Sequence, residues 1–137
     1  MLFDLKTVLF LCTHNSARSQ MAEAYLNKLY GDRYQANSAG VHPTRINPYV
    51  VKVMAEDGMD LSGARSKSIE EYLDRNFDLV VTVCDDARES CPVFPGDELI
   101  HHGFKDPSTL KGSEDEILAQ VREIRDEIKK WVKEYFK

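Results

Sequence analysis

The stretch TVLFLCTHNSARS, residues 7–19, is the part of this sequence that most strongly predicts both a fold and a chemistry. An apolar run typical of a strand ends at Cys12, a polar loop follows, and a helical pattern begins at Arg18. A cysteine at a strand end that leads into a helix faces unpaired backbone N–H groups and the positive end of the helix dipole. Such groups bind a tetrahedral oxyanion and stabilise the sulfur as a thiolate. The stretch therefore predicts a nucleophile inside an anion-binding loop.

Arg18 lies six positions after the cysteine, and its planar guanidinium can bind two oxygens of the anion. Ser16 and Ser19 supply hydroxyl groups that can hydrogen-bond the thiolate. The spacing of cysteine and arginine is weak evidence by itself, because a buried strand-end cysteine near an exposed arginine is common. The strand, loop, helix and hydroxyl groups converge on one site, which favours the functional interpretation.

Composition and charge limit the class of protein. A chain of 137 residues is long enough for a core of its own, and we expect a single domain over residues 1–137. Charged residues make up 30% and hydrophobic residues 42%, as in soluble globular proteins, and the net charge of −5 argues against nucleic acid as a partner. The N-terminal stretch resembles neither a signal peptide nor a membrane span, so we expect a cytoplasmic protein without a membrane partner.

Strands and helices alternate along the chain, which predicts an α/β fold with a parallel sheet. We expect strands at 7–12, about 34–38, 79–84 and 98–102, and helices at 18–30, 47–57, 68–75, near 85–90 and at 114–136. TVLFLC and DLVVTVC are near-continuous apolar runs, typical of central strands buried on both faces. The expected architecture is a three-layer sandwich, with a central four-stranded parallel sheet and helices on both faces. If the two apolar strands are neighbours, Cys12 and Cys84 lie at the same edge of the sheet.

The three cysteines are too few, and odd in number, for a secreted disulfide framework. Six residues separate Cys84 from Cys91, whereas paired zinc ligands normally have two to four residues between them, so we expect no metal site. One interpretation is that Cys84 is a core residue and Cys91 an incidental loop residue. The other is a three-thiol relay, in which Cys84 exchanges with Cys12 and Cys91 with Cys84, and each bridge requires Cα atoms within about 4.4–6.8 Å of each other.

At CTHNSARSQMAEAYL (residues 12–26) the sequence resembles the phosphate-binding loop and first helix of low-molecular-weight protein tyrosine phosphatases and of the arsenate reductases that share their fold. The rest of the chain resembles the arsenate reductase branch. The matching segments, in the expected order, are NSAG (37–40), INPYVVKVMAEDGMDLS (46–62), DLVVTVCDDARESCP (78–92) and GFKDP (103–107). The resemblance implies an oxyanion-binding loop made by Thr13, His14, Asn15, Ser16, Ala17, Arg18 and Ser19.

The resemblance also implies a reaction, in which Cys12 attacks arsenate while Asp106 protonates the departing oxygen. Cys84 then attacks the Cys12 sulfur and releases arsenite, and Cys91 attacks Cys84 to leave a disulfide that thioredoxin reduces. The implied role is arsenic detoxification by a monomer without cofactor or metal, with phosphate and sulfate as competing anions and weak phosphatase activity as a by-product. On the residues alone, Asp106 before Pro107 is also compatible with an ordinary Asp-Pro turn.

Three positions depart from the pattern of the relatives. His14 stands where relatives often have glycine, and Ala17 stands where many have another cysteine. Lys67 stands where some related reductases have an aspartate that helps to bind potassium, and the other positions of that site match as Asn15, Glu23 and Ser38. We expect the lysine ammonium to replace the cation, and the alternative is a solvent-exposed lysine.

Two other functions compete with arsenate reduction. A tyrosine phosphatase acting through a phosphocysteine would need only the loop, Cys12, Arg18 and Asp106. It would leave Cys84 and Cys91 without a role, and the phosphatase branch usually has aromatic residues after its Asp-Pro, where this chain has serine and threonine. A non-enzymatic anion-binding or phosphocarrier module would need neither Asp106 nor the cysteine pair.

Overall fold

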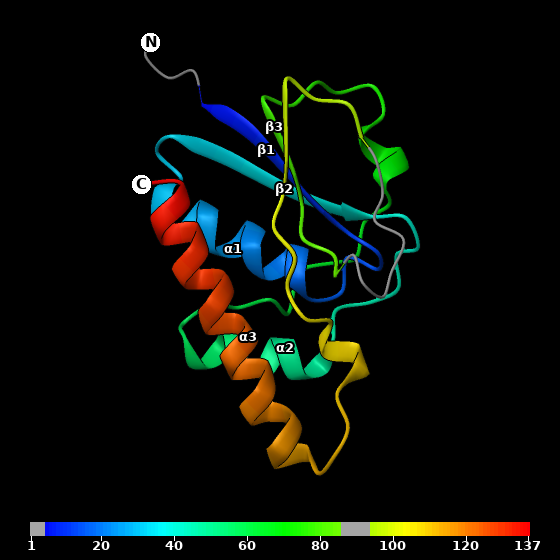
Figure 1. The fold of residues 1–137 in the computed structure, drawn as a ribbon, viewed down its shortest axis with the longest axis vertical. Coiled ribbons are helices and arrows are strands. Elements are labelled where there is room, and N and C mark those ends of the chain that lie inside the picture. Colours follow the sequence, from blue (N-terminus) through cyan, green and yellow to red (C-terminus); the bar gives the residue numbers. More distant parts are fainter. Residues whose placement is uncertain (1–4, 86–93) are drawn as a thin grey trace.

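The computed structural model describes residues 5–85 and 94–137 as one parallel sheet with helices packed against it (Figure 1). In chain order the elements are β1 (Lys6–Cys12), α1 (Arg18–Tyr30), β2 (Tyr34–Gly40), α2 (Pro48–Glu56), the 3-10 helix η1 (Ile69–Tyr72), β3 (Leu79–Thr82), β4 (Glu98–His101), the 3-10 helix η2 (Pro107–Thr109) and α3 (Glu114–Tyr135). The strand order is β2-β1-β3-β4, and all neighbouring pairs are parallel. The predicted four-stranded parallel sheet is confirmed.

Most element boundaries differ from the prediction by one or two residues, and the differences near the sheet edge and before β3 are the most informative. β2 continues to Gly40, and β3 ends at Thr82, although the Val83 N–H still donates to the Leu11 carbonyl at 2.9 Å. The helix expected over 68–75 is a single 3-10 turn over Ile69–Tyr72. The helical stretch expected near 85–90 lies, apart from Asp85, outside the described residues.

Side chains of β1 alternate between two apolar layers, as expected for a central strand. Val8 and Phe10 face a core shared with α1, α2 and α3, while Leu9 and Leu11 face a smaller core on the other side of the sheet. That second core also contains the buried aromatic residues Tyr72 of η1, Phe77 and Phe94. The 3-10 helix η1 therefore packs on this face of the sheet. Helices therefore cover both faces, but the three α-helices share one face (Figure 1).

The register brings the carboxyl ends of the central strands together. Leu11 of β1 pairs with Thr82 of β3, and Cys12 pairs with Gly40 of β2. Because Cys84 follows β3 by two residues, it lies at the same edge of the sheet as Cys12. This confirms the prediction that the two cysteines share one edge.

The helix N-termini differ in how their N–H groups are satisfied. Asn47 caps α2 by accepting from the Tyr49 N–H at 2.8 Å, with Pro48 in the first turn, and Ser113 forms a capping box with Glu116 at α3. Ala17, at the start of α1, provides no side-chain cap. No capping side chain at Ala17 therefore competes with an anion for the first N–H groups of α1.

One carboxylate connects the three α-helices on the crowded face. Asp57, at the end of α2, accepts hydrogen bonds from the Tyr25 hydroxyl of α1 at 2.7 Å and from Lys129 Nζ of α3 at 2.9 Å. These bonds lower the pKa of Asp57, while burial and the hydrogen bond to Asp57 raise the pKa of Tyr25.

No helix in the described parts of the chain, 5–85 and 94–137, is both long and apolar enough to cross a bilayer.

We expect Asp57→Asn to lower the free energy of unfolding by about 1–2 kcal/mol at pH 7, because Tyr25 and Lys129 lose a charged acceptor. The pKa of Asp57 is lower in the folded protein than in the unfolded chain. Its stabilising effect is therefore complete above the unfolded pKa of about 3.9 and is lost as the pH falls through the folded value. Urea unfolding at pH 7 and at pH 3 tests this.

The matched control is Glu127→Gln, which makes the same charge change at an exposed position of α3. The difference between the parent protein and Asp57→Asn should shrink at pH 3, and the control should show little difference at either pH. A difference for Asp57→Asn that is unchanged between the two pH values would contradict this account.

Candidate active site

The loop between β1 and α1 turns its carbonyl groups away from its centre. They accept hydrogen bonds from the segments that surround the loop: Thr13 O from the His42 N–H at 2.9 Å, Asn15 O from Ser66 Oγ at 2.9 Å, and Ser16 O from the Asn47 N–H at 2.9 Å. In a planar trans peptide the N–H points opposite to the C=O. The N–H groups that follow these carbonyls therefore point inward, together with the uncapped start of α1, as an oxyanion site requires.

The end of β2 approaches this loop so closely that it needs a glycine. A Cβ atom on Gly40 would lie 2.6 Å from the Thr13 carbonyl oxygen and 2.8 Å from the Asn15 nitrogen. Within the described residues, Asn15 is the one non-glycine residue with positive φ, at 51°, a conformation that asparagine tolerates. The tight turn of the loop therefore falls on Asn15, so histidine at position 14 needs no glycine-like backbone conformation.

Asn15 also links the loop to the nucleophile through its side chain. Its Oδ1 accepts from the Lys67 N–H at 2.8 Å, which fixes the orientation of the amide, and its Nδ2 donates to Ser19 Oγ at 2.7 Å. Ser19 Oγ lies 2.8 Å from Cys12 Sγ. A thiolate has no hydrogen to donate, so in that state of Cys12 the Ser19 hydroxyl donates to the sulfur and stabilises its charge.

The two strand-end cysteines differ in state. Cys12 is a free thiol with 2% of its surface exposed, at the mouth of the loop. Cys84 is fully buried, its Sγ lies 3.8 Å from the Leu11 carbonyl oxygen, and it is disulfide-bonded. Cys12 and Cys84 are therefore close along the sheet edge but not bonded to each other. Cys91, the third predicted thiol, lies outside the described residues.

The structure brings Arg18 and Asp106 together, 88 positions apart in the sequence. The buried Arg18 donates from Nη1 to the Phe104 carbonyl at 3.3 Å, and its Nη2 lies 3.7 Å from Asp106 Oδ2. The other carboxylate oxygen of Asp106 accepts from the Ser108 N–H at 2.9 Å. The Asp-Pro turn is therefore real, and it holds the Asp106 carboxylate with Oδ2 toward Arg18.

Behind the loop, Lys67 takes part in a partly buried polar cluster. Its Nζ lies 3.1 Å from Glu23 Oε1, which also accepts from Ser38 Oγ at 2.5 Å. Only 15% of the Lys67 side chain is exposed, so the alternative of a solvated lysine is wrong. Across residues 5–85 and 94–137, no group of three or more His, Cys, Asp and Glu side chains is arranged to hold a metal.

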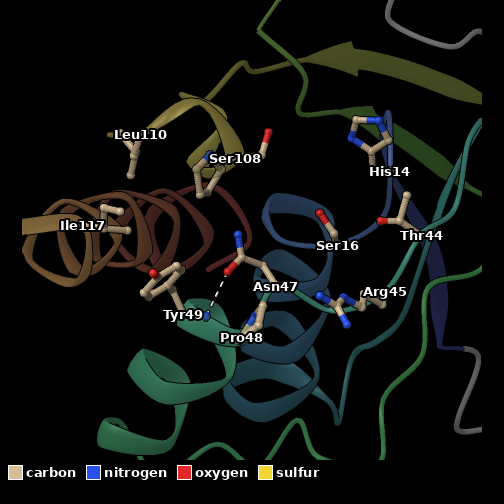
Figure 2. Close-up of a pocket in the computed structure, with 11 residues that line it drawn as sticks. His14, Ser16, Thr44, Arg45, Asn47, Pro48, Tyr49, Ser108, Leu110 and Ile117 are labelled. Atoms are coloured by element: carbon tan, nitrogen blue, oxygen red, sulfur yellow. Dashed lines mark hydrogen bonds between the residues drawn. The ribbon is translucent and has the colours of Figure 1, made fainter. Parts of the chain in front are cut away.

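A pocket of about 430 Å³ opens beside the loop (Figure 2). His14 and Thr44 lie at one end of it and Leu110 and Ile117 at the other, with Ser16 and Asn47 between them. Arg45, which is exposed in the segment before α2, and the partly buried Tyr49 of α2 also line this pocket, and neither was predicted as a site residue. The pocket provides room for a group attached to the bound oxyanion.

Gln20 is another residue of the site that was not predicted from the sequence. Its Nε2 donates to Asn15 Oδ1 at 2.8 Å and to the Arg65 carbonyl at 2.9 Å, although the residue is almost completely buried. A polar side chain in the first turn of α1, on the side of the core, was the available signal. Gln20 thus fastens the loop to the segment that carries Lys67.

Ser19→Ala should make Cys12 less reactive toward alkylating agents, because its sulfur loses a hydrogen-bond partner at 2.8 Å. We expect alkylation by iodoacetamide to slow about three- to tenfold, as for the loss of one ordinary hydrogen bond of about 1 kcal/mol. The measurement uses a background with Cys84→Ser and Cys91→Ser, so that only one thiol reacts. Ser16→Ala in the same loop is the control, and equal rates for the two variants would contradict the assigned role of Ser19.

Comparison with known proteins agrees with this geometry. Residues 7–137 match the model of the family described as low molecular weight phosphotyrosine protein phosphatase. An arsenate reductase of Halalkalibacterium halodurans is 44% identical over 131 residues, which cover 95% of this chain and 94% of the relative. The crystal structure of an Archaeoglobus fulgidus arsenate reductase has 36% identity and a TM-score of 0.67, covering 93% of this chain and 99% of that one.

A Corynebacterium glutamicum thioredoxin-dependent arsenate reductase aligns at 28% identity with a TM-score of 0.62, covering 94% of this chain and 62% of that one. The match to the family model spans nearly the whole chain and includes the loop, both strand-end cysteines and Asp106. The chain therefore belongs to the low molecular weight phosphotyrosine protein phosphatase family.

Proposed function

We propose that this protein reduces arsenate to arsenite with electrons supplied by thiols. The observation that carries the proposal is the free, buried Cys12 inside an anion loop, with a second cysteine, Cys84, at the end of the adjacent strand. Simple ester hydrolysis needs the first cysteine but not the second. The curated relative from Halalkalibacterium halodurans, named an arsenate reductase, supports the same choice.

The first step uses the residues of the loop. Arsenate binds to the inward N–H groups and to Arg18, and the Cys12 thiolate attacks arsenic. A hydroxyl group of arsenate leaves as water after it receives a proton from Asp106, whose Oδ2 already lies on the side of Arg18. An arsenic–sulfur bond replaces an arsenic–oxygen bond, and arsenic remains in its pentavalent state.

The second step transfers the electrons. The Cys84 thiolate attacks the Cys12 sulfur, the sulfur–arsenic bond breaks, and its electron pair stays on arsenic, which leaves as arsenite. Cys91 then attacks the Cys84 sulfur and releases Cys12 as a thiolate. A structure in which Cys84 is disulfide-bonded while Cys12 is free supports this order, because that state follows the release of Cys12.

Thioredoxin is the proposed reductant of the final disulfide. The structurally similar Corynebacterium glutamicum protein, which is named a thioredoxin-dependent arsenate reductase, supports this choice. Thiols are also kept reduced in the cytoplasm, where we expect the protein to act. All the residues that the scheme uses belong to one chain, so we propose that the protein acts as a monomer. Phosphate and sulfate have the shape and charge of arsenate and should compete for the same loop.

Hydrolysis of phosphate monoesters is the proposed side activity. Beside the loop, the pocket has apolar walls at Tyr49, Leu110 and Ile117, which suit the organic group of an ester. Aromatic residues do not follow Asp106, where Ser108 and Thr109 are exposed, so such esters should be held weakly. The activity should be slow compared with arsenate reduction.

Lys67 is proposed to replace a bound potassium ion as the positive charge beside Glu23. Its ammonium group neutralises Glu23 at 3.1 Å, while its N–H orients Asn15 and thereby Ser19. An external cation would compete with a charge that is already covalently attached. No cation requirement is therefore expected.

Cys12→Ser should abolish arsenate reduction and phosphate ester hydrolysis, because both need the nucleophile. Cys84→Ser and Cys91→Ser should each stop multiple-turnover arsenate reduction and largely preserve hydrolysis of an aryl phosphate. The measurements are arsenate-dependent oxidation of NADPH, coupled through thioredoxin and thioredoxin reductase, and release of 4-nitrophenol. Turnover of arsenate by both relay variants at the parent rate would show that the scheme is wrong.

Arsenate reduction by the parent protein should be the same in potassium and sodium buffers of equal ionic strength. Lys67→Met should lower the free energy of unfolding by about 1–3 kcal/mol, because it leaves the partly buried Glu23 unpaired. Lys52→Met is the control, since Lys52 forms an exposed pair with Glu114. A rate for the parent protein that rises with potassium alone would contradict the proposed role of Lys67.

A further inference from the structure

The segment that carries both Asp106 and the Phe104 carbonyl packs against the only tryptophan of the chain. Trp131 of α3 lies 4.9 Å from the His102 ring and 6.0 Å from the Phe104 ring, measured between ring centroids. His102 and Phe104 lie 4.8 Å from each other. The three rings, which we call the ring clamp, are therefore in mutual contact on the face of the sheet that α3 covers.

The backbone of this segment runs between the clamp and the strand that ends near Cys84. The His102 N–H donates to the Thr82 carbonyl at 2.9 Å, and the Phe104 N–H donates to the Val83 carbonyl at 3.2 Å. A Cβ atom on Gly103 would lie 2.7 Å from the Cys84 carbonyl oxygen. The strand side thus limits the segment in one direction, and the rings limit it in the other.

Two contacts to Arg18 originate on the same short segment. The Phe104 carbonyl accepts from Nη1 at 3.3 Å, and two residues later Asp106 Oδ2 lies 3.7 Å from Nη2. Lys105, between them, is exposed. The packing of the Phe104 ring therefore fixes the position of the Phe104 carbonyl, which holds the Arg18 guanidinium. It also fixes the backbone that leads into the turn at Asp106.

Trp131 itself is held from behind by the core. It contacts Phe10 of β1 at 6.5 Å, Phe136 at 5.7 Å and Tyr135 at 5.3 Å between centroids. β1 is the strand that ends in Cys12. The ring clamp thus connects the strand of the nucleophile to the segment of the acid through side chains that touch neither the anion nor the reacting atoms.

We propose that Trp131 is a positioning residue, which acts through His102 and Phe104 to hold Arg18 and Asp106 in register with the oxyanion loop. Loss of the clamp should lower the affinity for the anion through Arg18 and slow the proton transfer through Asp106. The first effect does not depend on the proposed reduction of arsenate. The second rests on the role of Asp106 as an acid in the proposed function.

Trp131→Leu removes the aromatic surface, and Trp131→Phe retains one ring for the clamp. Isothermal titration of inorganic phosphate should show affinity that is about three- to tenfold weaker for Trp131→Leu and within about twofold of the parent for Trp131→Phe. The control is Val121→Ala, which opens the buried core of the same helix away from the clamp. Equal losses of affinity in Trp131→Leu and Val121→Ala would show that Trp131 serves only the stability of the fold.

The second readout compares two aryl phosphates with different leaving groups. Phenol needs a proton from the acid far more than 4-nitrophenol does, so Trp131→Leu should lower the kcat ratio of phenyl phosphate to 4-nitrophenyl phosphate by about tenfold. A general loss of folded protein lowers both rates equally and leaves the ratio unchanged. An unchanged ratio together with an unchanged phosphate affinity overturns the proposal.

His102→Ala keeps the experiment decisive if Trp131→Leu does not fold, because His102 is exposed and its loss removes the clamp from the loop side. It should weaken phosphate binding in the same direction, and parent-like affinity in that variant overturns the proposal. Phosphate binding is measured without arsenate or thioredoxin. A failure of arsenate reduction is therefore distinguishable from a failure of the clamp.

Discussion

The side chain of Asn15 is the constraint on which the rest of the site depends. It sits at the positive-φ turn of the loop, accepts from the Lys67 N–H and donates to Ser19, so one amide sets the path of the backbone and the position of a hydroxyl group. That hydroxyl oxygen lies 2.8 Å from the Cys12 sulfur. A substitution at this position would change the turn, the link to the surrounding segment and the environment of Cys12 together.

The electrostatics of the site are local and oppose the charge of the whole chain. The net charge is −5, yet the site gathers an uncapped helix N-terminus, inward N–H groups and the guanidinium of Arg18. The other two α-helices begin with side-chain caps. The contrast has a physical reason, because a capping side chain at Ala17 would occupy the donors that an anion must reach.

Two cysteines at one sheet edge need different surroundings for different chemistry. Cys12 points to hydroxyl and N–H donors that favour a thiolate, whereas Cys84 is fully buried beside the Leu11 carbonyl. The parallel pairing of β1 and β3 brings both to the same edge and leaves their side chains in these separate environments. In the proposed relay, the first environment favours attack on an oxyanion and the second a later attack on sulfur.

Much of the fold was predictable from the sequence, because apolar runs that end in polar loops depend on local chemistry. The central strands, the bounds of α1 and the start of α2 near residue 47 follow from neighbouring residues, whereas the shared edge of Cys12 and Cys84 also needed β1 and β3 to pair. Lys67 could be predicted to replace a cation only through resemblance to relatives. No periodicity marks a lysine that pairs with a distant glutamate.

Other features were decided only by the tertiary structure. The contact of Arg18 with Asp106, the links made by Gln20, the pocket beside the loop and the packing of Trp131 on His102 and Phe104 all join residues far apart in the chain. The placement of all three α-helices on one face also depends on packing, because an amphipathic helix records that it has a buried face but not which side of the sheet that face meets. The sequence by itself determined the cysteine and its anion-binding loop, because the strand, loop and helix that form them are consecutive in the chain. The tertiary structure decided which distant residues contact that loop.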